Sequence, residues 1–108
     1  MSGFTHAAEL ADVPDGGVLA VEVEGLDLAL VRCGDEVFAV RDECSHAAVP
    51  LSEGEVEDCT LECWLHGSRF DAPTGEVLNL PATEPVPVYP CKVTEDSTVL
   101  VDVTSPSI

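Results

Sequence analysis

The residues best suited to chemistry in this 108-residue chain lie in two short clusters of cysteine and histidine. The first is Cys44-Ser45-His46, the second is Cys63-Trp64-Leu65-His66, and 16 residues separate them. Each cluster offers one thiolate and one imidazole. Thiolates suit zinc and iron–sulfur clusters, whereas imidazoles suit zinc, copper or iron. The four side chains could close a tetrahedral zinc site. They could equally hold a [2Fe–2S] cluster in which two histidines replace two cysteines on one iron.

The order of the ligands separates these two kinds of site. Zinc fingers usually place a pair of cysteines first and a pair of histidines second. Here each cluster has a cysteine followed by a histidine, so the two cysteines can converge on one iron and the two histidines on a second. With this pattern, C-x-H followed by C-x-x-H, the chain resembles the Rieske [2Fe–2S] proteins. A small β domain that holds structural zinc and binds a partner protein remains a distant alternative.

The resemblance covers nearly the whole chain. It continues through Gly67-Ser68-Arg69-Phe70-Asp71, Thr74-Gly75 and Leu80-Pro81-Ala82. In the family these segments are the second cluster loop, a hairpin turn and a proline loop that lies over the cluster. The glycines are expected to supply turn conformations that other residues adopt poorly, and Pro81 is expected to cap the cluster.

The resemblance also implies a role for each ligand. The thiolates of Cys44 and Cys63 are expected to bind the inner iron. The neutral imidazoles of His46 and His66 are expected to bind the outer iron through Nδ1. A partner that docks over the two histidines would then face the outer iron. Trp64 lies between the ligands of the second cluster. Its candidate roles are stacking at the docking surface and shielding of the cluster, of which shielding is the simpler.

Three positions differ from the high-potential members of the family. Those proteins carry a disulfide between cysteines at the positions of Val49 and Leu65, and a tyrosine at the position of Phe70. Hydrogen bonds to the cluster sulfurs raise the reduction potential, and Phe70 cannot donate one. Ser68 keeps a hydroxyl that either donates toward the cluster or bonds within its own turn. We therefore expect a potential near the low end of the Rieske range, near or below about −100 mV.

Short alternating runs separated by turn residues predict an all-β chain. We expect strands over residues 18–24, 26–30 and 37–40, hairpin arms over 59–62 and 68–71, and a final hairpin over 91–93 and 98–103. Four prolines between residues 80 and 90 predict a loop or an edge strand. The only helical turn is expected near residues 5–10. The predicted fold is the Rieske fold: a single domain over residues 1–108, with a small antiparallel β-sandwich and a cluster-binding lobe at about 42–72.

The chain is strongly acidic, with a formal net charge of −17. Such a charge excludes ordinary nucleic-acid binding, which needs lysine and arginine to replace counterions. It would also repel anionic lipid, and no stretch approaches the ~18 apolar residues of a membrane span. We expect solubility from this charge and steering toward a basic docking surface on a partner.

Cysteine usage gives an expectation about the compartment. Five cysteines cannot all pair within one chain. With Cys44 and Cys63 taken as ligands, we expect Cys33, Cys59 and Cys91 to be free thiols that behave as small hydrophobes. Together with the lack of a cationic leader before an apolar run, this predicts a cytoplasmic protein.

The resemblance implies an electron carrier rather than an enzyme. A ring-hydroxylating oxygenase also needs a mononuclear iron held by two histidines and a carboxylate, yet only His6, an expected surface residue, remains. No glycine-rich dinucleotide-binding turn is present. We expect a monomeric, low-potential ferredoxin that carries single electrons from a flavoprotein NAD(P)H-dependent reductase to a terminal aromatic ring-hydroxylating dioxygenase. The alternative is a similar ferredoxin linked to iron–sulfur cluster assembly or to another reductase or monooxygenase system.

Overall fold

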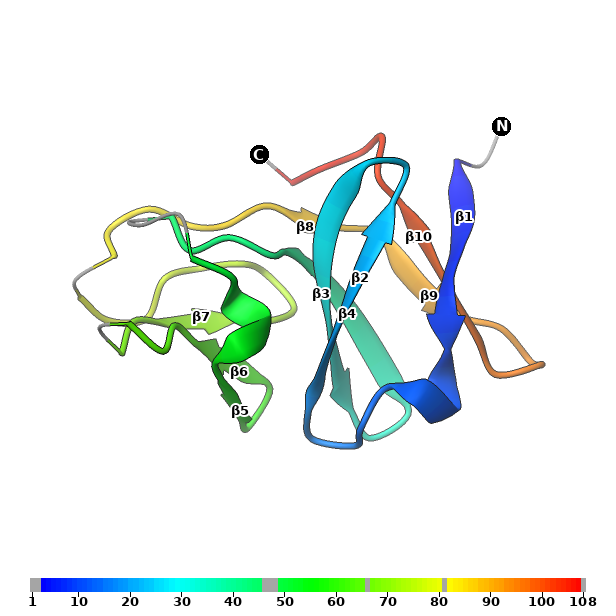
Figure 1. The fold of residues 1–108 in the computed structure, drawn as a ribbon, viewed down its shortest axis with the longest axis horizontal. Coiled ribbons are helices and arrows are strands. Elements are labelled where there is room, and N and C mark those ends of the chain that lie inside the picture. The colour runs from blue at the N-terminus through cyan, green and yellow to red at the C-terminus, as the bar shows by residue number, and fades with distance from the viewer. Residues whose placement is uncertain (1–2, 46–48, 66, 81, 108) are drawn as a thin grey trace.

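Antiparallel β-strands make up most of the regular structure of this chain (Figure 1). The structure is a computed structural model that describes residues 3–45, 49–65, 67–80 and 82–107. Its strands are β1 (Phe4–Glu9), β2 (Val18–Val23), β3 (Leu26–Cys33), β4 (Glu36–Arg41), β5 (Glu55–Glu57), β6 (Thr60–Glu62), β7 (Arg69–Asp71), β8 (Val88–Tyr89), β9 (Cys91–Val93) and β10 (Thr98–Asp102). Two short 3₁₀ turns are η1 (Leu10–Asp12) and η2 (Leu51–Glu53).

The strands form three sheets. β1, β10 and β9 form the first, β2, β3, β4 and β8 form the second, and β5, β6 and β7 form the third. The third sheet, with the loops around it, lies at one end of the molecule and is called the lobe below (Figure 1). The predicted all-β class, the meander over residues 18–41 and the hairpin arms of the lobe are confirmed.

Strand β3, inside the second sheet, is buried on both faces over residues 28–31, and its side chains alternate between those faces. On β3, Leu28 and Leu30 pack into a core shared with the first sheet, together with Val99 and Val101 of β10. Ala29 and Val31, which alternate with the two leucines along β3, enter a second core shared with the lobe. That lobe core consists of Ala29, Val31, Val40, Cys44, Leu51, Leu61, Cys63, Phe70, Ala72, Ala82 and Val86. The second sheet, called the central sheet below, therefore packs against the first sheet on one face, forming the sandwich, and against the lobe on the other face.

The prediction of a helical turn near residues 5–10 is wrong. Residues 4–9 form β1, which pairs with β10 from Phe4 opposite Asp102 to Glu9 opposite Thr98. A register shift between His6 and Ala8 accommodates the pairing. The local preference of an alanine-containing segment is weak, and pairing with a distant strand overrides it.

The proline-rich segment behaves as predicted. Its only described strand is β8, which has two residues and pairs with β4 at the edge of the second sheet. The final hairpin is also confirmed, with Val99 of β10 opposite Val93 of β9. Among the described residues, no helix has the length and apolar character needed to span a membrane.

Candidate metal centre

Two loops of the lobe begin at the predicted cysteine ligands and close in the same way. The backbone N–H of Cys44 donates to the carbonyl of Val49 at 3.0 Å. The N–H of Cys63 donates to the carbonyl of Ser68 at 2.7 Å. Each hydrogen bond joins the cysteine to the fifth residue after it. Gly67, at a φ of 80°, donates to the carbonyl of Cys63 and tightens the second loop, as predicted for this glycine.

The two cysteines lie in the same apolar environment. Cys44 is 3% exposed and Cys63 is fully buried, and both belong to the lobe core. Neither cysteine is part of a disulfide. The structure thus brings two sulfur donors from separate loops into one core, on the side of the central sheet that faces the lobe.

The predicted histidine ligands, His46 and His66, lie outside the described residues, as does Pro81. Within the part of the chain that the structure describes, no three histidine, cysteine or acidic side chains come together as a metal-binding group. The third histidine, His6, is exposed on β1, as predicted for a residue outside the site.

Asn79 joins the second cysteine loop to the segment that follows β7. Its side-chain Oδ1 accepts a hydrogen bond from the N–H of Arg69 at 2.6 Å. Its Nδ2 donates to the carbonyl of Gly67 at 3.0 Å. Asn79 therefore hydrogen-bonds to the backbone on both sides of Ser68. No sequence motif indicates this role of Asn79.

Two serines complete the attachment of the third segment, by which we mean residues 79–80 and 82–86. Ser68 is fully buried, and its Oγ accepts the N–H of Ala82 at 2.9 Å. Ser45, next to the first cysteine, donates from its Oγ to the carbonyl of Glu84 at 2.6 Å. This third segment is thus bonded to both cysteine loops. The sequence left two roles for the Ser68 hydroxyl, donation toward the cluster or a bond within its own turn; in the structure its oxygen accepts a bond from the third segment.

Gly75 allows the hairpin turn after β7 to approach this segment closely. Its φ is 78°, and the N–H of Val86 donates to its carbonyl at 2.9 Å. A Cβ at this position would collide with the backbone oxygen of Val86. Gly75 is needed both for its backbone conformation and for the space it leaves.

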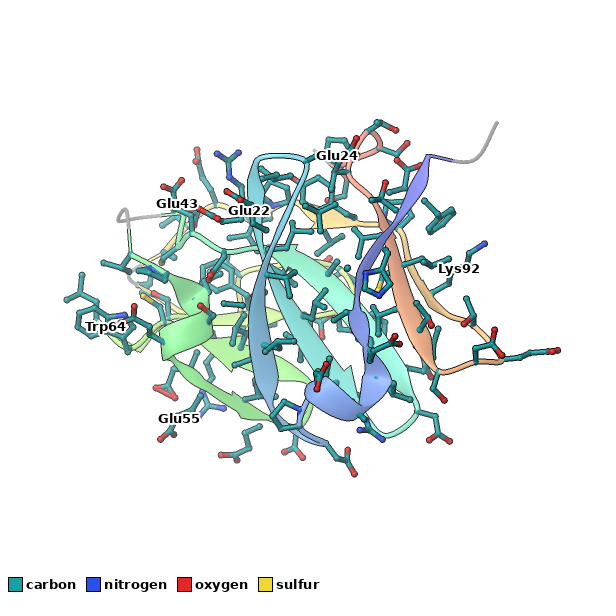
Figure 2. The ribbon with its side chains drawn as sticks, turned by 45° about the vertical axis from the view of Figure 1, so that its right-hand side comes forward. Glu22, Glu24, Glu43, Glu55, Trp64 and Lys92 are labelled. Carbon is teal, nitrogen blue, oxygen red and sulfur yellow. A yellow bond between two sulfur atoms is a disulfide. The ribbon has the colours of Figure 1, made fainter. Side chains whose placement is uncertain are left out.

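The exposed large apolar side chains come from the second cysteine loop and from the segment after β7. In the described residues they are Trp64, Leu65, Leu78 and Leu80, exposed by 51%, 38%, 51% and 72%. Figure 2 shows Trp64 projecting from the lobe end of the molecule, whereas Lys92 lies at the opposite end. The half-exposed side chain of Trp64 suits the docking role, and the shielding role stays a prediction. Trp64 lines a surface hollow with Glu53, Gly54, Glu55 and Glu62.

Three positions distinguish this chain from the high-potential Rieske proteins, and they lie in different environments. Phe70 is fully buried in the lobe core, and Val49 packs against that core. Leu65 faces solvent. Neither Val49 nor Leu65 is a cysteine, so no disulfide links the two cysteine loops through these positions. Phe70 has no phenolic hydroxyl to offer to the core around it.

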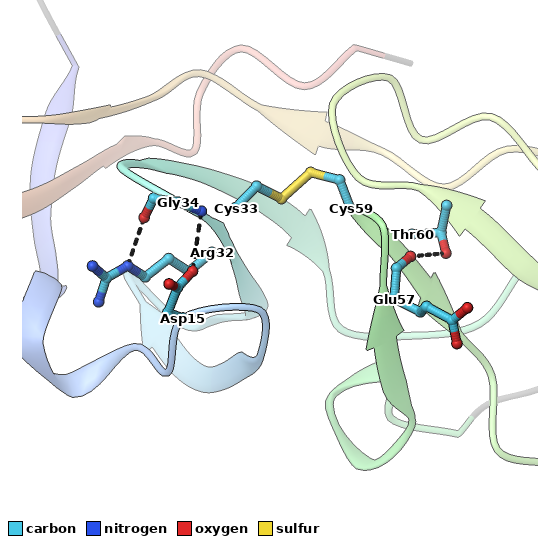
Figure 3. The surroundings of a disulfide bond; sticks show 7 residues. All are labelled: Asp15, Arg32, Cys33, Gly34, Glu57, Cys59 and Thr60. Atoms are coloured by element: carbon cyan, nitrogen blue, oxygen red, sulfur yellow. Dashed lines mark hydrogen bonds between the residues drawn. A yellow bond between two sulfur atoms is a disulfide. The ribbon is translucent and has the colours of Figure 1, made fainter.

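The prediction that Cys33 and Cys59 are free thiols is wrong. They form a disulfide between the end of β3 and the β5–β6 turn, with Cα atoms 5.8 Å apart (Figure 3). The two residues are 26 positions apart and meet only because the lobe packs on the central sheet. Cys91 is outside the disulfide, as predicted, and burial raises the pKa of its thiol to about 12.

The described residues fit an iron–sulfur cluster. Two thiols without a disulfide, withdrawn from water in a common core, are the donors that such clusters require. The hydroxyl of Ser68 accepts from Ala82 and retains its own hydrogen for donation. A third segment bonded to both loops limits their movement. The arrangement can hold a soft metal centre and exclude water from its sulfur side.

Comparison with known proteins agrees with this assignment. Residues 3–90 match the family model described as the Rieske [2Fe-2S] domain. The chain is 40% identical over 99 residues to the ferredoxin component of the naphthalene 1,2-dioxygenase system of Pseudomonas aeruginosa, which covers 92% of this chain and 94% of the relative. The ferredoxin of carbazole 1,9a-dioxygenase from Nocardioides aromaticivorans IC177 superimposes with a TM-score of 0.87 at 35% identity, over 93% of this chain and 97% of that one.

A second solved structure contains a partner. It is a complex of reduced oxygenase and oxidised ferredoxin in carbazole 1,9a-dioxygenase. The matching chain has a TM-score of 0.85 at 31% identity and covers 94% of each chain.

Proposed function

Because this chain belongs to the Rieske [2Fe–2S] domain family, we propose that it is the ferredoxin of a multicomponent aromatic dioxygenase system. It receives single electrons from a flavoprotein NAD(P)H-dependent reductase and delivers them to a terminal ring-hydroxylating oxygenase. It contributes electron transfer and no hydroxylation chemistry of its own. The names of its relatives and the ferredoxin–oxygenase complex support this role.

The observation that carries the proposal is the burial of Cys44 and Cys63 in one core. These residues, with His46 and His66, are proposed to hold one [2Fe–2S] cluster. The bound cluster supplies a centre that gains and loses one electron. The chain keeps the cysteine sulfurs dry and fixes both loops through Ser45, Ser68 and Asn79. Fixed loops reduce the structural change that accompanies each electron.

The exposed apolar residues near the cysteine loops are proposed as the docking face for the oxygenase. Trp64 and Leu65 follow Cys63 directly, and Leu78 is bonded to Arg69 through its backbone N–H. Large exposed apolar side chains are favoured at protein interfaces, and tryptophan is frequent among the residues that dominate binding. Docking here brings the partner close to the cluster loops.

Acidic residues border this face and favour a basic partner. Glu53, Glu55 and Glu62 line the hollow beside Trp64. Figure 2 places Glu43 and Glu55 at the same end of the molecule as Trp64. A net charge of −17 steers a basic oxygenase or reductase surface toward the ferredoxin. The carrier is proposed to be a cytoplasmic monomer that meets its two partners in turn.

Reconstitution tests this function. The holoprotein is combined with a flavoprotein reductase, NADH and a naphthalene or carbazole oxygenase, and hydroxylated product is measured. Product should form only with this chain present, and Cys63→Ser should abolish it. The substrate is set by the oxygenase, because the ferredoxin does not contact it. If reduced holoprotein transfers no electrons to any oxygenase of this class, a role in cluster assembly or another reductase system gains support.

A further inference from the structure

The Cys33–Cys59 disulfide joins the two parts of the molecule that the cluster site depends on. Cys33 ends β3 in the central sheet, and Cys59 lies in the turn before β6 in the lobe (Figure 3). Both side chains pack against the lobe core and are only half-buried. The bond therefore spans the junction between sheet and lobe and stays within reach of small thiols.

Each cysteine of the disulfide leads along the chain to one proposed cluster ligand. After Cys33 the chain turns into β4, which ends at Arg41, shortly before Cys44. After Cys59 the chain forms β6, which ends at Glu62, immediately before Cys63. The disulfide thus links the starts of two arms, and the proposed cluster would link their ends.

The turn that carries Cys59 is poorly suited to cysteine. Asp58 and Cys59 are the two residues between β5 and β6, with φ values of 50° and 63°. Two-residue hairpin turns of this kind strongly prefer glycine at the second position, because other residues are strained there. The hydroxyl of Thr60 donates to the carbonyl of Glu57 across the turn at 2.6 Å. A cysteine in this strained position is best explained by the bond its side chain makes.

The other end of the disulfide is firmly anchored. Beside Cys33, the N–H of Gly34 donates to Oδ1 of Asp15 at 3.1 Å, and Nε of Arg32 donates to the carbonyl of Gly34 at 2.8 Å (Figure 3). The guanidinium of Arg32 also reaches the carbonyl of Val13 at 3.1 Å. The bond therefore ties the lobe to a fixed point on the main body.

We propose that Cys33 and Cys59 form a reversible redox clamp that holds the cluster-binding lobe on the central sheet. With the clamp closed, the lobe stays in place whether or not a cluster is bound. With the clamp open, only the lobe core and the connecting segments hold it, so the lobe opens more often and releases its cluster faster. In the cytoplasm proposed above, disulfides are usually of this redox-responsive kind.

The clamp closes by thiol–disulfide exchange with an oxidant that carries a disulfide, such as a small-molecule disulfide or a thiol–disulfide oxidoreductase. One cysteine thiolate attacks the oxidant to form a mixed disulfide and releases one thiol. The second thiolate then attacks the protein sulfur and releases the other. The protein loses two electrons and two protons, and the oxidant becomes two thiols. A dithiol opens the clamp by the reverse steps.

The test compares holoproteins in two assays. Release of the cluster to an iron chelator is followed by visible absorbance, and cleavage within residues 50–80 is followed by limited proteolysis. Cys33→Ser, Cys59→Ser and the double variant should each release the cluster about tenfold faster or more, and all three equally, because one bond is lost in each. Cys91→Ser, which removes a cysteine outside the disulfide, should match the wild type.

Two further arms separate the clamp from other causes. Cys59→Gly relieves the strained turn yet removes the bond, so it should release its cluster as fast as Cys59→Ser. A phosphine reductant should accelerate release from the wild type but not from the double variant, which controls for direct damage to the cluster. The proposal is overturned if the double variant keeps its cluster and its protease resistance at the wild-type level. It is also overturned if alkylation in denaturant finds Cys33 and Cys59 as thiols after incubation with a disulfide oxidant. None of these readouts depends on an oxygenase partner.

Discussion

The N–H of Ala82 donates a 2.9 Å hydrogen bond to the Oγ of Ser68, where the serine is fully closed off from solvent. Ser68 also accepts the N–H of Cys63 through its carbonyl. One residue therefore closes the second cysteine loop and holds the third segment against it. The stability of the site should therefore depend more on Ser68 than on Ser45, the exposed serine of the first cysteine loop.

Replacing Ser68 with alanine should leave the amide of Ala82 buried without a partner. A buried unpaired polar group costs about 1–3 kcal/mol, so Ser68→Ala should lower the free energy of unfolding of the holoprotein by that amount. Denaturant titration checks this. The matched control is Ser45→Ala, whose hydroxyl bonds to Glu84 at the surface and whose loss should cost less than about 1 kcal/mol. Equal losses of unfolding free energy in the two variants would mean that the buried Ser68–Ala82 hydrogen bond stabilises the protein no more than the exposed bond of Ser45.

Two glycines with similar backbone conformations should respond differently to alanine. Gly25 and Gly75 have φ values of 82° and 78°, but a Cβ meets nothing at Gly25 and collides with the Val86 backbone at Gly75. Gly25→Ala should cost about 1–2 kcal/mol from the left-handed conformation alone. Gly75→Ala should cost about 1–3 kcal/mol more, from overpacking. Equal melting temperatures for the two variants would argue against close contact between the turn and the third segment.

Electron transfer to the oxygenase should slow as salt is added. Long-range attraction between exposed charges is screened beyond about 10 Å at 0.1 M ionic strength, and charges at the rim of an interface act mainly on the association rate. Stopped-flow measurement of the second-order rate constant checks this. Glu55→Gln, beside Trp64, should lower the rate at low salt. Glu95→Gln, in the β9–β10 turn at the other end of the molecule (Figure 1), should change it little. A rate independent of salt contradicts steering.

The reduction potential should lie near or below about −100 mV. Phe70, in the same core as both cysteines, has no hydroxyl to donate, and hydrogen bonds to the sulfurs raise the potential. A spectroscopic redox titration gives the midpoint. Ser68→Ala removes a hydroxyl from the core and should shift the midpoint to a more negative value. A clearly positive midpoint in the wild type would contradict this explanation.

The central meander could be predicted from the sequence because its apolar residues alternate over residues 18–41 and its turns contain glycine. The pairing of β1 with β10 could not, because it joins residues at opposite ends of the chain, from Phe4 with Asp102 to Glu9 with Thr98. The same limit applies to the disulfide, since Cys33 and Cys59 meet only across the packed lobe. Asn79 and Ser45 were missed because they bond to backbone groups, which leave no pattern in the sequence. The motif indicated all four proposed ligands, whereas the exposure of Trp64 required the fold.

The central claim is that the lobe holds one redox-active [2Fe–2S] cluster through Cys44, His46, Cys63 and His66. Iron, acid-labile sulfide and zinc are measured in the anaerobically purified protein, together with the electron paramagnetic resonance spectrum of the reduced form. The Cys63→Ser variant is measured in parallel. We predict two irons and two sulfides per chain with a Rieske-type signal, all lost in the variant; one zinc per chain without sulfide or signal would contradict the claim.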